Sequence, residues 1–420
     1  MRCGSWLPPL AFGVVGLLVV LSCARSPALP GVTPLAGTPS SEDGPPPTSE
    51  SATLWYLTRG GIKADQGWGV AVDESGDVYF ATHQQAPGEL FSDMLIYRIT
   101  PVGAQVWQTR WGGKFMEKAF VVAVDSGVVY VGGLTYTSAN LTQADMAVLA
   151  LDAADGHLLW DFTWGQGYGY EEVDGLVVDG ESLYVSGWTT GEATSTDVGL
   201  LRLTREGELV WESAWGTPQW DQADGQMVVD EESIFVSGRY KAQNILLGGE
   251  GLLVRFSKET GKYLQHTTWG GPIGTDALGL TSDGTYLYAV GLTVDEGQGG
   301  QIFVRKYDKR LILMWASLWG GAKSESARAI AVDPSGYVVV AGESGSGGAG
   351  GLDLVLLRLG PDGGLVWSRQ WGGPANEGAL GLALSGSVAY IAGSTHSFGM
   401  GQDDAVLLKV DLVRGLVPAP

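Results

Sequence analysis

Residues 206–216 read Glu-Gly-Glu-Leu-Val-Trp-Glu-Ser-Ala-Trp-Gly, and variants of this stretch occur seven times along the 420-residue chain. Its two tryptophans, Trp211 and Trp215, are four residues apart, so a β-strand turns both side chains toward one face. The second position of the pair falls at residues 59, 111, 164, 215, 269, 319 and 371, with spacings of 52, 53, 51, 54, 50 and 52 residues. This period indicates one structural unit repeated along the chain rather than two or three separate domains.

The paired positions hold most of the tryptophan in the chain. Arg59 and Gln265 replace a tryptophan in two degraded copies. Twelve of the 16 tryptophans occupy the remaining positions: Trp55, Trp107, Trp111, Trp160, Trp164, Trp211, Trp215, Trp269, Trp315, Trp319, Trp367 and Trp371. We interpret these as structural anchors, because a residue present in every copy is explained most simply by the construction of the repeat.

Each repeat contains four short apolar segments. Between the sixth and seventh anchors they are residues 329–332, 337–341, 354–359 and 365–371. Each segment is rich in Val, Leu, Ile, Tyr or Trp and is bounded by Gly, Asp, Pro or Ser, which is typical of strands joined by turns. Four antiparallel strands per repeat, arrayed radially, predict an all-β protein, a seven-bladed β-propeller of four-stranded blades.

The two ends of the repeat array are offset from one another. A fourth-strand segment, residues 54–59, precedes every other element, and the last repeat ends at residues 406–410 without a fourth strand. We expect the N-terminal segment to pair in the last blade, because this closes the ring and removes an exposed sheet edge. The propeller is therefore predicted to span residues 52–411, followed by a C-terminal tail at residues 412–420.

Several short motifs carry a resemblance to a known family. The Trp-Gly-Gly, Gly-(Ile/Leu)-Ala-Val-Asp and Val-Tyr-Val-x-Gly steps resemble the bacterial seven-bladed β-propeller repeat over residues 53–411. Residues 151–160, Leu-Asp-Ala-Ala-Asp-Gly-His-Leu-Leu-Trp, also resemble the tryptophan-docking repeat of quinoprotein dehydrogenases. An outer-membrane-assembly lipoprotein propeller has a similar repeat. The resemblance implies a fold and not an activity, since propellers host many unrelated functions.

The N-terminus is typical of an exported protein. Residues 1–22 combine a basic start at Arg2 with a short apolar run, as in a signal peptide. The four residues ending in Cys23, Val-Leu-Ser-Cys, resemble the bacterial lipobox, in which the cysteine becomes the lipidated first residue. The alternative is an ordinary signal peptide with an incidental cysteine. Residues 23–51 are rich in Pro, Ser, Thr and Gly and are predicted to be a disordered tether. We expect an extracytoplasmic protein of the bacterial cell envelope, attached to the membrane by its lipid.

Charge and cysteine content exclude several classes of function. The formal net charge is −21 and the isoelectric point is about 4.5, so a nucleic-acid partner is not expected. Both cysteines, Cys3 and Cys23, lie at the N-terminus, so the predicted propeller has no disulfide and no cysteine-based metal site. We expect a monomer.

Two sets of charged residues recur with the repeat. An acid opens the third strand, with a basic residue five positions later that an extended strand turns to the opposite face. We expect these to pair between blades or to cap loops; they are Asp93, Asp145, Asp197, Glu250, Asp353 and Asp404, with Arg98, Arg202, Arg255, Lys306, Arg358 and Lys409.

A second acid precedes the innermost strand. It is Asp65, Glu117, Glu171, Glu325 or Glu377, with Gln222 and Thr275 departing from the pattern. One interpretation is a ring of carboxylates that holds Ca²⁺ at the channel mouth. We favour the other, in which each carboxylate accepts backbone N–H bonds in its own loop, because the ligand spacing of a calcium loop is absent.

Residues that break the repeat are the better candidates for binding. The long connections after the second strands lie on one face of the disc, and loops of this kind commonly carry function. Two adjacent blades place aromatic and acidic residues there, and these would suit a carbohydrate, a cationic ligand or a protein. In the alternative interpretation the aromatics pack against neighbouring loops. The candidates are Tyr168, Tyr170, Glu171, Glu172, Trp188, Trp220, Asp221 and Asp224.

Conventional catalytic signatures are missing from the sequence. It has neither a Gly-x-Ser-x-Gly motif nor a Walker loop, and its four histidines fall in different repeats. We therefore predict no catalytic residue, metal or cofactor, and favour a binding or scaffolding protein with an unidentified ligand.

Two alternatives to this interpretation stay open. One is a quinoprotein-like dehydrogenase or another propeller enzyme. The blade count of seven, the missing cysteine pair and the lack of a polar cluster clearly directed at the central axis stand against it. The other is a partner-binding subunit of an outer-envelope assembly complex.

Overall fold

The computed structural model describes residues 32–34 and 54–419, apart from Pro87, Tyr168 and residues 191–194, 243–248, 271–273 and 295–298. The predicted signal peptide, the lipidation site at Cys23 and most of the predicted tether lie outside the described residues, as does the candidate Tyr168. Among the described residues, no helix is long and apolar enough to cross a membrane.

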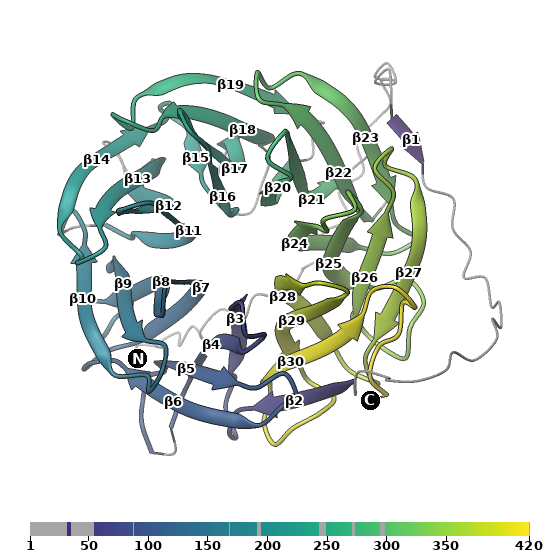
Figure 1. Cartoon of the computed structure of the whole chain (residues 1–420), viewed down its shortest axis with the longest axis horizontal. Coiled ribbons are helices and arrows are strands. Elements are labelled where there is room, and N and C mark those ends of the chain that lie inside the picture. Colours follow the sequence, from purple (N-terminus) through teal and green to yellow (C-terminus); the bar gives the residue numbers. More distant parts are fainter. Residues whose placement is uncertain are drawn as a thin grey trace, which may run out of the picture. The chain divides into compact units, whose positions relative to one another are not determined.

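Seven antiparallel sheets make up the compact unit formed by residues 32–420, and Figure 1 shows them arranged around a central axis. The innermost strands are β3 (Gln66–Val72), β7 (Glu117–Asp125), β11 (Glu172–Asp179), β15 (Trp220–Gln222) with β16 (Met227–Val229), β20 (Gly274–Ser282), β24 (Glu325–Val332) and β28 (Glu377–Ser385). The second strands are β4 (Val78–Gln84), β8 (Val128–Tyr136), β12 (Ser182–Thr190), β17 (Ser233–Ala242), β21 (Tyr286–Val294), β25 (Val338–Ser344) and β29 (Val388–Thr395).

The outer half of each blade consists of two further strands. The third strands are β5 (Asp93–Ile99), β9 (Ala144–Asp152), β13 (Thr196–Thr204), β18 (Glu250–Ser257), β22 (Gly300–Asp308), β26 (Asp353–Leu359) and β30 (Asp404–Asp411). The outermost strands are β6 (Gln105–Trp111), β10 (Leu158–Trp164), β14 (Leu209–Trp215), β19 (Tyr263–Trp269), β23 (Leu313–Trp319), β27 (Leu365–Trp371) and β2 (Trp55–Arg59). The seven-bladed propeller with four-stranded blades is confirmed.

The ring closes as predicted. β2 pairs antiparallel with β30 in the last blade, with Trp55 opposite Lys409 and Arg59 opposite Ala405. A short strand, β1 (Val32–Pro34), pairs in parallel with β23 on the outer edge of the fifth blade. These three residues belong to the segment that the sequence predicts to be a disordered tether.

Apolar side chains form one buried cluster at each junction between consecutive blades. At the junction of the first two blades, for example, Tyr79 and Ile96 pack against Val131 and Leu149. The remaining six clusters join the other pairs of neighbours, including the last blade and the first. The core is therefore divided into seven parts, and each blade is stabilised mainly by its two neighbours.

The first tryptophan of each pair docks on the next blade. The indole Nε1 of Trp107 donates to the carbonyl of Ala153 at 3.0 Å, and its ring covers Gly156 in the turn between β9 and β10. Trp55, Trp160 and Trp315 donate in the same way to the turns of their neighbours. A Cβ atom on Gly156 would lie 2.7 Å from the Trp107 ring, and Gly156 has a φ of +79°, so this turn requires glycine.

The start of the predicted C-terminal tail takes part in the ring. Asp411 and Leu416 exchange backbone hydrogen bonds, and Arg369 donates from Nε to the carbonyl of Gly415 at 2.8 Å. A Cβ atom on Gly415 would lie 3.3 Å from the ring of Trp367. Residues 411–416 thus supply the docking turn that the last blade would otherwise lack.

Candidate functional site at the central channel

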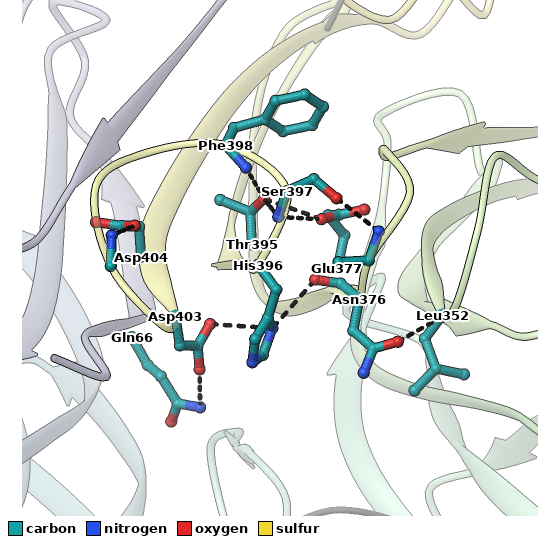
Figure 2. Close-up of polar contacts among 12 residues, drawn as sticks. Gln66, Leu352, Asn376, Glu377, Thr395, His396, Ser397, Phe398, Asp403 and Asp404 are labelled. Atoms are coloured by element: carbon teal, nitrogen blue, oxygen red, sulfur yellow. Dashed lines mark hydrogen bonds and ion pairs between the residues drawn. The ribbon is translucent and has the colours of Figure 1, made fainter. Parts of the chain in front are cut away.

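The recurring acid of the innermost strand fixes its own loop, as Figure 2 shows for Glu377. This carboxylate accepts from Thr395 Oγ1 at 3.0 Å, from the backbone N–H of Ser397 at 3.0 Å and from that of Gly373 at 2.8 Å. Asp65 accepts from the N–H groups of two loops, and Glu325 from that of Gly321. The favoured interpretation, in which these acids accept backbone N–H bonds, is confirmed at these positions.

In the fourth blade this role moves by one residue. Asp221 accepts from the backbone N–H of Thr217 at 2.5 Å and from that of Lys241 at 2.8 Å. Asp221 is fully buried. Its carboxylate accepts the backbone hydrogen bonds that the acid at the position of Gln222 accepts in other repeats. Asp221, a candidate binding residue, is therefore occupied within its own loop.

The acid and base of the third strand act separately, as expected. Asp404 accepts from the backbone N–H groups of Met400 and Gly401, which caps the long loop. Arg358 pairs with Asp333 at 2.9 Å and donates to the carbonyl of Leu412 in the next blade at 3.1 Å. The predicted loop capping and blade-to-blade contact are both observed.

Three of the predicted candidates meet beside the channel. Trp188, only 8% exposed, stacks on Tyr170 with ring centroids 4.7 Å apart and an interplanar angle of 17°. Trp188 Nε1 donates to Glu172 at 2.7 Å and the Tyr170 hydroxyl donates to it at 3.1 Å. One face of Trp188 is thus covered by Tyr170, and this cluster has its own internal partners.

The remaining candidates are dispersed. Glu171 is buried and accepts from the N–H of Thr190. Trp220 is half-buried in β15, where it pairs with Ala242. Asp224 alone lies with the channel-lining residues. The predicted exposed patch of aromatics and acids is not assembled as one surface.

A pocket lies on the axis, partly open to solvent, and residues from all seven innermost segments line it. Their side chains differ from blade to blade, in contrast to the repeated anchors. We call it the channel pocket; its main lining residues are Trp68, Phe120, Asp174, Asp224, Gln226, Leu278, Arg328 and Leu380. The expectation that no polar cluster is directed at the axis is therefore wrong.

Sequence reasoning missed most of this pocket although a signal was present. Five of the lining residues occupy one position of the repeat, three residues after the recurring acid or its replacement at the start of the innermost strand. Buried and half-buried residues alternate along these strands. The five are Phe120, Asp174, Leu278, Arg328 and Leu380. Comparing the copies at this one position gives the lining directly. The lining residues come from all seven blades, so aromatic and acidic residues concentrated in two blades do not indicate it.

One group of ion-paired side chains includes the pocket residue Asp224. Arg239 donates from Nη2 to Asp276 at 2.5 Å and also contacts it through Nε, while its Nε lies 4.0 Å from Asp224. The guanidinium of Arg328 lies 5.3 Å from the ring centroid of Trp68. The channel wall therefore holds both acids and a base.

Burial controls the titration of these groups. It raises the pKa of Asp174 and of Asp224, and the positive charge of Arg328 opposes the shift in part. Burial also raises the pKa of Glu172, against the hydrogen bonds from Trp188 and Tyr170. It lowers the pKa of Lys118. Each charged form is thus disfavoured by poor solvation in the channel.

One group of side chains at the turn between β9 and β10 has the arrangement of metal ligands. Asp152, Asp155 and His157 bring three ligand atoms within 4.8 Å of one another. However, Asp155 Oδ1 is hydrogen-bonded to His157 Nδ1 at 2.7 Å, and Asp152 accepts from the backbone of Ala154. These bonds account for the arrangement as an ordinary exposed turn.

The sequence matches one known protein family. The family model described as outer membrane protein assembly factor BamB matches residues 92–346, more than half of the chain. The chain belongs to this family. No curated protein sequence matches it.

Solved structures share the fold of this BamB-family protein at low sequence identity. The WD40 β-propeller domain of Doa1 is 12% identical, with a TM-score of 0.52 over 85% of this chain and 97% of that chain. The Neurospora crassa Pan2 WD40 domain is also 12% identical, with a TM-score of 0.51 over 86% and 97%. At this identity the likeness shows the propeller fold alone.

Proposed function

We propose that this protein is a lipid-anchored propeller of the bacterial cell envelope that binds a protein partner in an outer-membrane assembly complex. The observation that carries the proposal is membership of the outer membrane protein assembly factor family over residues 92–346. A scaffolding role is supported by the use of the repeated residues in the construction of the propeller, which leaves the variable residues of the channel and loops for binding.

An exposed apolar patch on the long-loop face supports a protein partner. Ile62, Leu90 and Met400 are 70%, 84% and 79% exposed. Their loops are tied together, because Gln85 donates its N–H to Asp65 and Gly401 packs closely on the backbone of Gly61. Exposed large apolar side chains on neighbouring loops are typical of protein interaction sites. We call Ile62, Leu90 and Met400 the apolar loop patch.

The test is co-purification from detergent-solubilised envelopes. The tagged full chain should retain an outer-membrane assembly component, and the Ile62→Ser/Leu90→Ser/Met400→Ser variant should retain at least ten-fold less of it. A matched control replaces Val102, Ile312 and Val413 by Ser, since these residues are 76%, 56% and 67% exposed in turns between third and outermost strands or in the equivalent turn at residues 411–416. If no envelope protein is retained by the unaltered chain, or if both variants lose it equally, the proposal fails.

The membrane anchor needs its own test because Cys23 lies outside the described residues. The Cys23→Ala variant should move from the membrane fraction to the soluble periplasmic fraction, because alanine cannot carry the acyl chains that hold the protein at the membrane. Retention of this variant in the membrane fraction would contradict lipidation as the means of anchoring.

The polar channel pocket makes a quinoprotein enzyme worth testing as a second candidate. Its charge fits poorly, because a quinone cofactor that bears carboxylates would meet the acids Asp174 and Asp224. The absorbance spectrum of the purified chain, and dye reduction with added quinone and Ca²⁺, decide the matter. We expect neither a quinone band nor dye reduction.

A further inference from the structure

We propose that the channel pocket binds one positively charged side chain, the ammonium or guanidinium group of a lysine or arginine carried by the protein partner. This inference rests on the proposed function and specifies the chemistry that the partner brings to the central channel.

Two carboxylate oxygens in the pocket lack a donor. Glu172 accepts from Trp188 and Tyr170, and Asp276 is held by Arg239. By contrast, the buried Oδ2 atoms of Asp174 and Asp224 have no hydrogen-bond partner among the described residues, although Oδ2 of Asp224 lies 4.0 Å from Nε of Arg239. A buried acceptor without a donor costs free energy, so a ligand that donates to it is bound more tightly.

The charges around the pocket are unbalanced. Asp174, Asp224 and Arg328 line the pocket, and the charged groups that interact with them or with one another next to it are the acids Glu172, Asp276 and Glu343 and the bases Lys118 and Arg239. Five acids against three bases leave room for added positive charge. A cationic group would take the place of the protons that Asp174 and Asp224 hold more tightly because of their burial.

The walls favour an organic cation over a metal ion. Trp68 and Phe120 form an edge-to-face pair with ring centroids 5.1 Å apart, and Arg328 already lies over Trp68. Aromatic rings attract ammonium and guanidinium groups. Ca²⁺ takes six to eight oxygen ligands, whereas this pocket has two carboxylate oxygens free of hydrogen bonds.

Glu172 and Asp174 lie at different levels of the innermost strand, and only Asp174 lines the pocket. Asp174 stands two residues further along β11 than Glu172, a step of roughly 7 Å in an extended strand. Lysine and arginine have flexible apolar stems that carry the charge over such a distance. A partner that contacts the loops can therefore place its charged group beside Asp174 and Asp224.

The test is titration calorimetry of the purified full chain with tri-lysine at pH 8. We expect saturable binding, weakened at least ten-fold by the Asp174→Asn/Asp224→Asn variant. Arg328→Met should strengthen binding several-fold, because it removes the competing internal cation. The matched control is Asp155→Asn/Asp161→Asn, which makes the same charge change at exposed sites away from the channel and should alter the affinity by less than two-fold.

The control separates the pocket from the general acidity of the chain. Equal losses in the channel and control variants would overturn the proposal, as would tighter binding of Ca²⁺ alone that abolishes tri-lysine binding. If the Asn variant does not fold, weaker binding by Arg328→Met would also overturn it. An Asn variant that keeps the envelope partner but loses tri-lysine binding would show that the pocket is not used by that partner, and would leave the proposed function intact.

Discussion

The glycine after the second anchor position makes room for an acid in most repeats, although Gly270 faces Thr275. A Cβ atom on Gly112 would lie 2.2 Å from Asp93 Oδ1 and 2.8 Å from Glu117 Oε2. The same position in other copies, at Gly165, Gly216 and Gly372, faces the third-strand aspartate in the same way. The recurring Trp-Gly step and the recurring acids are therefore one structural device.

This device predicts different effects at two adjacent glycines. Gly112→Ala should lower the free energy of unfolding by about 2 kcal/mol, because the added methyl overlaps the Asp93 carboxylate. Gly113→Ala is the control: its Cβ would meet its nearest atom at 3.6 Å, so stability should stay the same or rise by up to about 1 kcal/mol. Urea unfolding measures both. Equal effects at the two sites would mean that the carboxylate does not set the requirement for glycine.

At the scale of the element, the degraded fourth blade shows how the repeat tolerates change. Gln265 replaces the docking tryptophan, and its Nε2 still donates to the carbonyl of Arg310 at 2.9 Å. The neighbouring turn has Leu311 at a φ of +62°, where other turns have glycine, and Leu311 is buried in the cluster between these two blades. The smaller glutamine thus leaves space that a leucine side chain fills.

The two changes should therefore be coupled. Gln265→Trp alone should destabilise the chain by about 2 kcal/mol, because the indole and Leu311 compete for one space. Leu311→Gly alone should also destabilise it, through the cavity left behind. The loss of unfolding free energy in the double variant should be smaller than the sum of the two single losses by at least about 1 kcal/mol. A double-mutant cycle of urea unfolding measures this difference. Additive effects would show that the two positions are independent.

The elements that could be predicted from the sequence are those that repeat. Period, strand patterning and turn residues specify the blades and the closure by β2, since each acts locally and occurs seven times. The shift of the loop acid from Gln222 to Asp221 could not be predicted, because it depends on the division of the innermost strand into β15 and β16. The channel pocket could not be predicted from residue types. Its lining residues occupy equivalent positions in the seven blades, but their side chains are chemically unlike one another.

For the whole molecule, closure by β2 should decide whether the ring persists. Deleting residues 51–61 removes β2 and leaves β30 as an exposed edge, and it takes Trp55, Tyr56 and Leu57 from two junction clusters. We expect the variant to aggregate or open, which light scattering after gel filtration would detect. Deleting residues 36–46 of the predicted tether is the control. It should change neither the oligomeric state nor the melting temperature. A monomeric β2-deletion variant with unchanged melting would contradict this role.

The junctions also set the dependence of stability on pH. Glu171 is fully buried near Asp145, and burial raises its pKa from 4.5 to about 7. The pKa of Asp145 at the same junction is also raised, as are those of Asp65 and Asp197 at other junctions, in each case mainly by burial. A group with a raised pKa binds its proton more tightly in the folded chain, so its contribution is fully present below pH 4.5 and is lost as the pH rises toward 7.

Aspartates in the tight turns act in the opposite direction. Hydrogen bonds from turn N–H groups and side chains outweigh burial and lower the pKa values of Asp73 and Asp283, so their contribution is lost as the pH falls below about 4. Stability should therefore be greatest in weak acid, near pH 5, and should decline toward pH 8.

Glu171→Gln tests the junction contribution, because glutamine keeps the shape of the protonated acid and cannot ionise. At about 1.4 kcal/mol per pKa unit, the variant should be more stable than the unaltered chain by up to about 3 kcal/mol at pH 8, and by less than about 1 kcal/mol at pH 5. Urea unfolding at both pH values measures this. Glu206→Gln, at an exposed turn, is the control and should follow the unaltered chain. If Glu171→Gln loses as much stability as the unaltered chain between pH 5 and pH 8, the buried junction acids do not govern this decline.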